Sequence, residues 1–211
     1  MWWDGGMLPG LVPPTDARAL LFDCDGTLVE TQSLYRMCWR QVFGRHGFDM
    51  SDEWFAIWAG HSVRPFVLAA FPGIDDDLLY AIADEGIALF LQSTHLLEPL
   101  EHVVEIARQY RGVLPMAVVS GGPRSAVHDS LVSVGILELF DHVVTVDDVA
   151  TGKPAPDAYI LAAELLGLTP AECVAYEDST SGLTSARDAG IGTIIDIRQH
   201  DPGTSPTFRL H

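Results

Sequence analysis

Lysine is nearly absent from this chain. Of its 12 basic residues, all but Lys153 are arginines, and the formal net charge at pH 7 is -17. A nucleic-acid backbone and an anionic membrane both require a basic binding surface, so we expect neither as a partner. A small phosphate ester remains possible as a ligand, because a metal ion and one lysine can reverse the local field.

Cysteine and long apolar segments are also scarce. The 3 cysteines, Cys24, Cys38 and Cys173, have neither disulfide-framework nor metal-site spacing, which favours a reducing compartment. No apolar run is long enough to span a bilayer, and the N-terminus lacks the basic stretch that precedes the apolar part of a signal peptide. We therefore expect a cytoplasmic protein.

Hydrophobic residues make up 48% of the 211 residues, which is typical of a globular chain with one large domain or two small ones. Short apolar runs, typical of buried parallel strands, alternate with helical patterns that end at glycine. The runs cover residues 19–22, 116–119, 143–146, 174–176 and 193–197, and the helical patterns cover residues 103–110, 127–134, 160–166 and 183–189. This alternation predicts a doubly wound parallel sheet of the α/β class.

Residues 31–98 interrupt the alternation. The segment has no strand-like run, and Leu34, Cys38 and Val42 share one helical face. We predict an all-helical unit over residues 31–98, inserted into an α/β core that is formed by residues 1–30 and 99–211.

Polar residues follow four of the predicted strands. The segments are Asp23-Cys24-Asp25-Gly26-Thr27, Ser120-Gly121-Gly122, Thr151-Gly152-Lys153 and Glu177-Asp178-Ser179. In an open α/β sheet, ligands bind beyond the carboxyl ends of the strands, so these segments are expected to meet at one edge. A single Asp-x-Asp is more often a capped turn, and a lone lysine can reflect compositional bias. Four such segments in this order indicate a ligand site.

Several carboxylates brought together would repel each other unless a cation lay between them. Oxygen ligands in this number suit Mg²⁺, which keeps part of its water shell and binds substrate phosphate. Lys153 would add a compact positive charge that the planar fork of arginine does not reproduce. The residues therefore predict a phosphate-binding site that uses magnesium.

The polar segments, with their flanking residues, resemble the four signature motifs of the haloacid dehalogenase superfamily. They are residues 22–28, 120–124 and 152–157, and Glu177-Asp178-Ser179 with Gly182. Within this superfamily the chain is most similar to the β-phosphoglucomutase-like phosphatases, which carry a helical cap inserted after the first motif. The resemblance extends from Arg18 to Arg198.

The resemblance implies catalytic roles for Asp23, Asp25, Ser120 and Lys153. Asp23 would be the nucleophile that forms an aspartyl-phosphate, held ionised by Mg²⁺ and Lys153. Asp25 would protonate the leaving alkoxide and then activate water. Ser120 and Lys153 would hold the phosphoryl oxygens. The implied Mg²⁺ ligands are Asp23, Asp25 through its backbone carbonyl, Asp178 and Glu177.

Further residues are expected at the substrate: Thr27, Gly121, Arg124, His61 and Arg64. Thr27 would orient the first loop, and Arg124 would contact phosphate or be a solvated residue of a first helical turn. His61 or Arg64 would contact the non-reacting end of the substrate, unless their segment is a surface turn that opens a helix at Pro65. Gly121 stands where many relatives have asparagine, which leaves the substrate preference open.

Three observations choose among the reactions of the superfamily. Asp25 favours phosphate chemistry, because the true dehalogenases lack an aspartate at this position. Phosphonate-cleaving members use a cap lysine, and residues 31–98 contain none. Mutases of the β-phosphoglucomutase type carry a histidine at the position of Tyr35, so we favour a phosphatase and keep a phosphosugar mutase as the alternative.

A binding or scaffold protein that kept only the fold is the remaining alternative, and it would be expected to have lost one of the four residues Asp23, Asp25, Lys153 and Asp178. The expected substrate is a small phosphate ester, with a sugar phosphate favoured and phosphoglycolate and nucleotide monophosphates left open. The expected assembly is a monomer or a weak homodimer.

Overall fold

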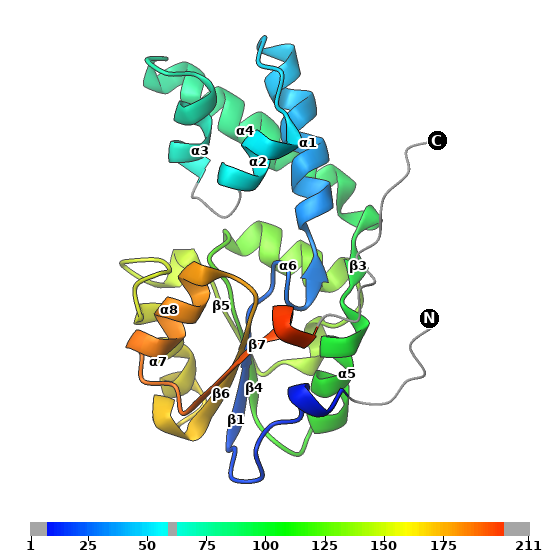
Figure 1. The fold of residues 1–211 in the computed structure, drawn as a ribbon, viewed down its shortest axis with the longest axis vertical. Coiled ribbons are helices and arrows are strands. Elements are labelled where there is room, and N and C mark those ends of the chain that lie inside the picture. Colours follow the sequence, from blue (N-terminus) through cyan, green and yellow to red (C-terminus); the bar gives the residue numbers. More distant parts are fainter. Residues whose placement is uncertain (1–7, 59–62, 201–211) are drawn as a thin grey trace. The chain divides into compact units, whose positions relative to one another are not determined.

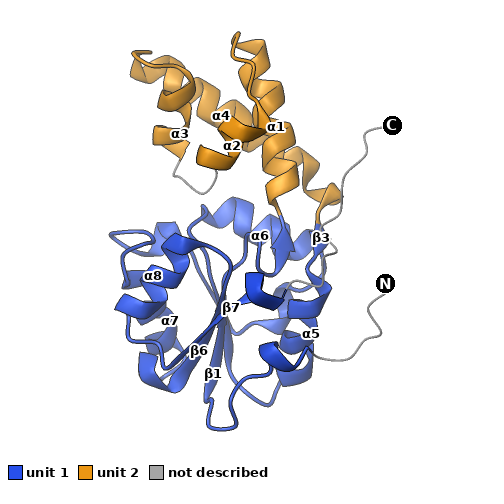
Figure 2. Cartoon of the chain, in the orientation of Figure 1, with its two compact units in different colours: residues 1–30, 98–211 blue, residues 31–97 orange. Residues whose placement is uncertain are grey.

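The computed structural model describes residues 8–58 and 63–200. The chain divides into two compact units, a sheet unit of residues 1–30 and 98–211 and a helical unit of residues 31–97 (Figure 2). The predicted insertion includes Glu98. In the structure Glu98 pairs with Glu30 in a short antiparallel ribbon and therefore lies with the sheet unit. The two ribbon strands are β2 (Val29–Glu30) and β3 (Glu98–Pro99).

A parallel sheet forms the centre of the sheet unit (Figure 1). Its 5 strands have the order β5-β4-β1-β6-β7, and each neighbouring pair is parallel. The strands are β1 (Ala19–Phe22), β4 (Met116–Val119), β5 (His142–Val144), β6 (Cys173–Glu177) and β7 (Thr193–Asp196). Every residue of β1, β4 and β6 is buried, because helices cover the sheet on both sides. The predicted α/β class with a doubly wound parallel sheet is confirmed.

The helices of the sheet unit are α5 (Glu101–Tyr110), α6 (Arg124–Ser133), α7 (Asp157–Leu165) and α8 (Thr180–Asp188). Helices α7 and α8 pack on one face of the sheet, and α5 lies on the other (Figure 1). Short 3₁₀ helices complete the unit: η1 (Pro9–Leu11), η3 (Leu137–Leu139), η4 (Val146–Asp148), η5 (Pro170–Glu172) and η6 (Ile197–His200). Gly135 and Gly190, which were predicted to end helices, have φ of 71° and 79°, a conformation that favours glycine.

The strand register determines which polar residues meet. Leu21 pairs with Ala117 on β4 and with Ala175 on β6, and all three pack in the cluster that includes α7. Side chains alternate between the faces of a strand. Asp23 and Glu177, two residues beyond Leu21 and Ala175, therefore point to the α7 face of the sheet.

The helical unit contains α1 (Gln32–Arg45), α2 (Asp52–Trp58), α3 (Val63–Ala70), α4 (Asp76–Ser93) and the single turn η2 (Thr94–Leu96). Its core is aromatic: the rings of Trp39, Phe43 and Phe66 have centroids 5.2 to 5.4 Å apart. Asp75 caps α4 by accepting a hydrogen bond from the backbone N–H of Leu78 at 2.8 Å. The unit therefore has a hydrophobic core of its own.

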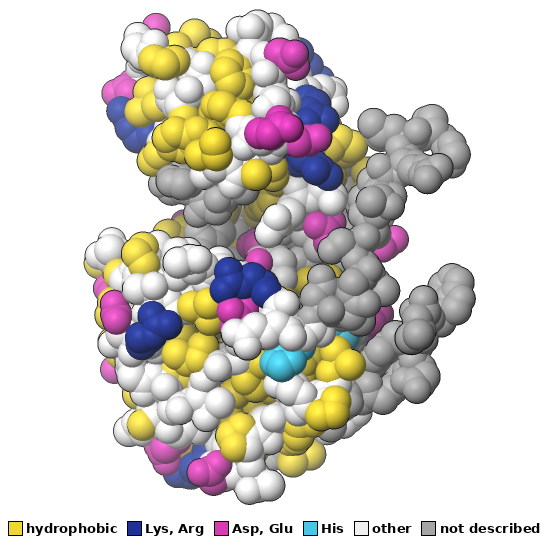
Figure 3. Space-filling model, in the orientation of Figure 1, with side chains coloured by type: hydrophobic (Ala, Val, Ile, Leu, Met, Phe, Trp, Pro, Cys, Tyr) yellow, Lys and Arg dark blue, Asp and Glu magenta, His cyan; other side chains and the backbone are white. Residues whose placement is uncertain are grey.

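Several arginines of the sheet unit form ion pairs with neighbouring carboxylates. The pairs are Arg18–Glu172, Arg108–Glu101, Arg124–Asp148 and Arg198–Asp196. On the face shown in Figure 3, basic side chains occur in separate groups, many of them beside acidic ones. Within residues 8–58 and 63–200, no helix is both long enough and apolar enough to cross a bilayer.

Candidate active site

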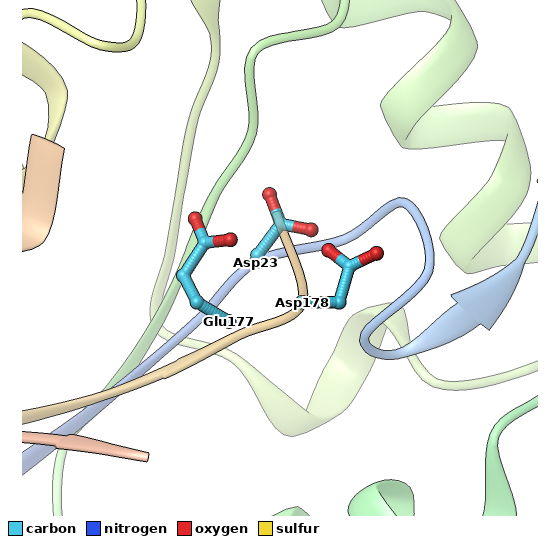
Figure 4. A group of neighbouring side chains, drawn as sticks. All are labelled: Asp23, Glu177 and Asp178. Carbon is cyan, nitrogen blue, oxygen red and sulfur yellow. The ribbon is translucent and has the colours of Figure 1, made fainter. Parts of the chain in front are cut away.

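Three carboxylates converge at the carboxyl ends of β1 and β6 (Figure 4). Asp23 directly follows β1, Glu177 is the last residue of β6, and Asp178 comes next. One oxygen of each carboxylate lies within 4.8 Å of the others. Asp23 is 6% exposed and Glu177 is 0% exposed, so solvent screens their mutual repulsion poorly.

Lys153 is the cation that contacts this group. Its Nζ donates to Asp23 Oδ1 at 2.7 Å, to Glu177 Oε1 at 2.5 Å and to the carbonyl oxygen of Val119 at 2.8 Å. These acceptors can take all the protons of the ammonium group. Burial by itself would lower the pKa of Lys153, but Asp23 and Glu177 raise that pKa above its ordinary value. The side chain therefore stays charged at neutral pH.

The three carboxylates can carry more negative charge than Lys153 compensates. Burial and the neighbouring Glu177 raise the pKa of Asp23 well above its ordinary value, although Lys153 opposes the shift. Burial and Glu177 also raise the pKa of Asp178 to about 7. If all three carboxylates were ionised, three negative charges less one positive charge would leave two. A divalent cation would remove that excess, and oxygen donors of this kind suit Mg²⁺. The donor set fits the predicted metal, with Asp23, Asp178 and Glu177 as the side chains that would hold it.

The Asp25 carboxylate has a different set of neighbours. Its Oδ2 accepts a hydrogen bond from Ser120 Oγ at 3.2 Å, and Ser120 Oγ accepts one from the Gly122 backbone N–H at 3.0 Å. A Cβ on Gly122 would lie 3.4 Å from Ser120 Oγ and 3.5 Å from Asp25 Oδ2, so the loop packs closely on the carboxylate. Thr27 is buried and donates to Asp178 Oδ1 at 3.4 Å. The first, second and fourth polar segments are thus joined through side chains.

Besides Lys153, Glu177 contacts residues that were not among the predicted site residues. The Tyr159 hydroxyl donates to Glu177 Oε1 at 2.9 Å, and Ser179 Oγ donates to Glu177 Oε2 at 3.2 Å. A Cβ on Gly182 would lie only 1.9 Å from Glu177 Oε1, so a larger residue there would displace the carboxylate. Tyr159 was not predicted as a site residue. It shares the apolar face of a helix with Ala162, and an aromatic ring on such a face indicates a core position. Ser179 could have been predicted as a site residue, because it directly follows Glu177-Asp178 in the sequence.

Other residues predicted to contact the substrate have different partners. Arg124 begins α6, and its guanidinium donates to both carboxylate oxygens of Asp148 at 2.5 and 2.6 Å. Arg64 belongs to the helical unit and donates to Asp76 there at 2.8 Å. Gly121 has no atom within 4 Å of the place that a Cβ would take. His61 lies outside the described residues. The substrate contacts of these four residues stay predictions.

Comparison with known proteins identifies the family. A family profile described as haloacid dehalogenase-like hydrolase matches residues 17–190 of the chain. The chain belongs to the haloacid dehalogenase-like hydrolases. The resemblance that rested on the four polar segments is therefore confirmed, and so is the prediction of a hydrolase.

Relatives of this haloacid dehalogenase-like hydrolase include named phosphatases. The chain is 31% identical over 183 residues to fructose-1-phosphate phosphatase YqaB of Escherichia coli, covering 85% of this chain and 95% of the relative. It is 30% identical over 188 residues to validoxylamine A 7'-phosphate phosphatase of Streptomyces hygroscopicus subsp. limoneus, covering 87% of each. Among solved structures, CbbY from Rhodobacter sphaeroides in complex with phosphate matches 83% of this chain and 84% of its own, at 26% identity and a TM-score of 0.73.

The raised carboxyl pKa values predict how pH and Mg²⁺ act together on the stability of this hydrolase. From about pH 4, where carboxyls of an unfolded chain ionise, to about pH 7, the folded protein keeps a proton on Asp178 that the unfolded chain has released, and the raised pKa of Asp23 acts in the same direction. The metal-free fold should therefore lose stability as the pH rises through this range. Mg²⁺ competes with protons for these carboxylates. At saturation it should raise Tm by about 3–8 °C at about pH 8 and by less at about pH 5.

Differential scanning fluorimetry with Mg²⁺ or with EDTA measures both shifts. Asp178→Asn should lose most of the Mg²⁺ shift, whereas Asp188→Asn, which changes an exposed carboxylate at the end of α8, should keep it. An equal Mg²⁺ shift at the two pH values would contradict the assignment of the metal to these carboxylates.

Proposed function

We propose that this protein is a Mg²⁺-dependent phosphatase of a small phosphomonoester, with a sugar phosphate as the expected substrate, and that it acts through an aspartyl-phosphate on Asp23. The observation that carries the proposal is the buried Asp23 carboxylate, which Lys153 holds at 2.7 Å beside Glu177 and Asp178. The names of the relatives add support, because both are phosphatases and one is named for a sugar phosphate.

In the first step, an oxygen of Asp23 would attack the phosphorus, so that a new P–O bond forms while the bond to the ester oxygen breaks. Lys153 would favour the ionised form of Asp23 and would offset negative charge on the phosphoryl oxygens. Asp25 would give its proton to the departing alkoxide, and the alcohol would leave. Mg²⁺, when held by Asp23, Asp178 and Glu177, supplies further positive charge for the phosphoryl group.

In the second step, Asp25 would act as a carboxylate and take a proton from water as the water oxygen attacks the phosphorus. The bond between Asp23 and phosphorus would break, and inorganic phosphate would leave. The different neighbours of the two aspartates support this division of work. Asp23 lies with Lys153 and two carboxylates, whereas Asp25 lies with the Ser120 hydroxyl. Different neighbours allow two carboxyls to hold different protonation states.

The environment of Tyr35 favours a phosphatase over a phosphosugar mutase, which would return the phosphoryl group to another hydroxyl of the sugar. The related mutases carry a histidine where this chain has Tyr35. In the helical unit the Tyr35 ring stacks on Phe90, with centroids 4.3 Å apart and an interplanar angle of 9°. An imidazole is the side chain suited to proton transfer near neutral pH, and the phenol of Tyr35 is a poor substitute for it.

A panel of phosphorylated metabolites tests the proposal. It should contain fructose 1-phosphate, glucose 1-phosphate, hexitol phosphates, phosphoglycolate and nucleotide monophosphates, and free phosphate should be measured with Mg²⁺ and with EDTA. We expect at least one sugar phosphate to be hydrolysed with kcat/KM of about 10⁴ M⁻¹s⁻¹. EDTA should lower that value about 100-fold or more, and added Mg²⁺ should restore it. Isomer formation with little phosphate release would favour the mutase, and a lack of turnover with every ester would reject both.

A further inference from the structure

Both oxygens of the Glu177 carboxylate accept hydrogen bonds from protein groups. Oε1 accepts hydrogen bonds from Lys153 Nζ at 2.5 Å and from the Tyr159 hydroxyl at 2.9 Å. Oε2 accepts from Ser179 Oγ at 3.2 Å, and Gly182 of α8 leaves no space beside Oε1. Glu177 is 0% exposed, so water is not at hand to replace a hydrogen-bond donor that is lost. Losing a donor there costs free energy. The orientation of the Glu177 carboxylate therefore depends on its hydrogen-bond donors and on the close packing of Gly182.

Tyr159 is the donor that comes from the hydrophobic layer under the site. Its side chain is 0% exposed and packs with the cluster between α7 and the sheet. Tyr159 lies in the first turn of α7, which follows Lys153 closely in the sequence. This position places the phenol near the carboxyl edge of the sheet. The ring also lies near Lys153, with Nζ 5.0 Å from the centroid. One side chain thus contacts both Glu177 and Lys153.

We propose that Tyr159 is a positioning residue for the phosphatase reaction. Its hydroxyl fixes the rotation of the Glu177 carboxylate, and Glu177 in turn shares Lys153 with Asp23. Without the hydroxyl, Oε1 would keep Lys153 as its donor, but the carboxylate would lose one of the contacts that hold it. The positions of the ammonium and of the Asp23 carboxylate would then be less restricted. The role in catalysis rests on the function proposed above, whereas the effect on Lys153 does not.

Tyr159→Phe tests this role, and Tyr176→Phe is its matched control. Tyr176 is also 0% exposed, and its hydroxyl also makes a hydrogen bond, to the Leu11 carbonyl at 2.8 Å. Its ring stacks on Phe22, with centroids 4.6 Å apart, so it packs among apolar residues and not on Glu177. Both variants lose one buried hydroxyl and keep the aromatic ring. We expect similar losses of Tm from the two.

Three measurements separate positioning from mere stability. Isothermal titration of the metal-free protein with Mg²⁺ should show a Kd about 10-fold higher in Tyr159→Phe and unchanged in Tyr176→Phe. With saturating Mg²⁺, kcat should fall about 10-fold in Tyr159→Phe with little change in KM. Because the chain has one lysine, protein labelled with ¹³C at lysine Cε gives a single side-chain lysine resonance. That resonance should shift or broaden in Tyr159→Phe and stay in place in Tyr176→Phe.

A Tyr159→Phe protein with the lysine resonance and the kcat of the wild type would overturn the proposal. Equal changes in both variants would also overturn it, because the effect would then follow the loss of any buried hydroxyl. A wild-type protein that hydrolyses no phosphate ester would reject the proposed function instead. The lysine resonance would still decide in that case whether Tyr159 positions Lys153.

Discussion

Asp23→Asn should lower phosphate release by about 1,000-fold or more and leave the fold intact. An amide does not attack phosphorus as a carboxylate does, although it has nearly the same shape. Burial and Glu177 raise the pKa of Asp23, so the ionised side chain costs folding free energy, and its removal should not lower Tm in metal-free buffer. The amide oxygen can still accept the hydrogen bond from Lys153. Measurements of kcat/KM and of Tm on the same preparation check both parts.

The control for this variant is Asp188→Asn, which makes the same chemical change at an exposed position and should leave kcat/KM unchanged. Acid-quenched wild-type protein incubated with its substrate should carry a phosphoryl group on the peptide that contains Asp23, and the Asp23→Asn protein should carry none. Turnover retained in Asp23→Asn would reject this residue as the nucleophile.

Lys153→Arg should lower kcat/KM by about 100-fold or more, although the positive charge is kept. Nζ lies between the oxygens of Asp23, Glu177 and Val119, at 2.5 to 2.8 Å from each. The Lys153 side chain is 6% exposed, so the space around it is closed. A planar guanidinium is wider than an ammonium and does not place one nitrogen among these three acceptors. Steady-state kinetics with saturating Mg²⁺ measures the loss.

Two further variants make this result specific. Lys153→Gln removes the charge, and a loss equal to that of Lys153→Arg would show that the compact shape matters as much as the charge. Arg187→Lys makes the opposite exchange at an exposed position of α8 and should leave kcat/KM unchanged. If Lys153→Arg keeps kcat/KM within about threefold of wild type, the argument for a compact point charge is wrong.

The central part of the fold could be predicted because its signals lie in consecutive residues. The run Ala19-Leu20-Leu21-Phe22 coincides with β1, and Met116-Ala117-Val118-Val119 coincides with β4. The other predicted runs are displaced by one or two residues at their ends, where apolar periodicity carries little information. The two-residue strands of the β2–β3 ribbon were not predicted, since a pair that short has no periodicity to read.

The sequence by itself determined which residue types stand at the strand ends. Asp23, Lys153 and Asp178 each come after a predicted strand, and their order along the chain can be read from the sequence. Only the tertiary structure decided the partners of each side chain. It placed Lys153 on Asp23 and Glu177, Asp25 with Ser120, and the phenol of Tyr159 under Glu177. A hydrogen bond depends on the packing of segments that are far apart in the chain, and neither periodicity nor spacing within one segment encodes that packing.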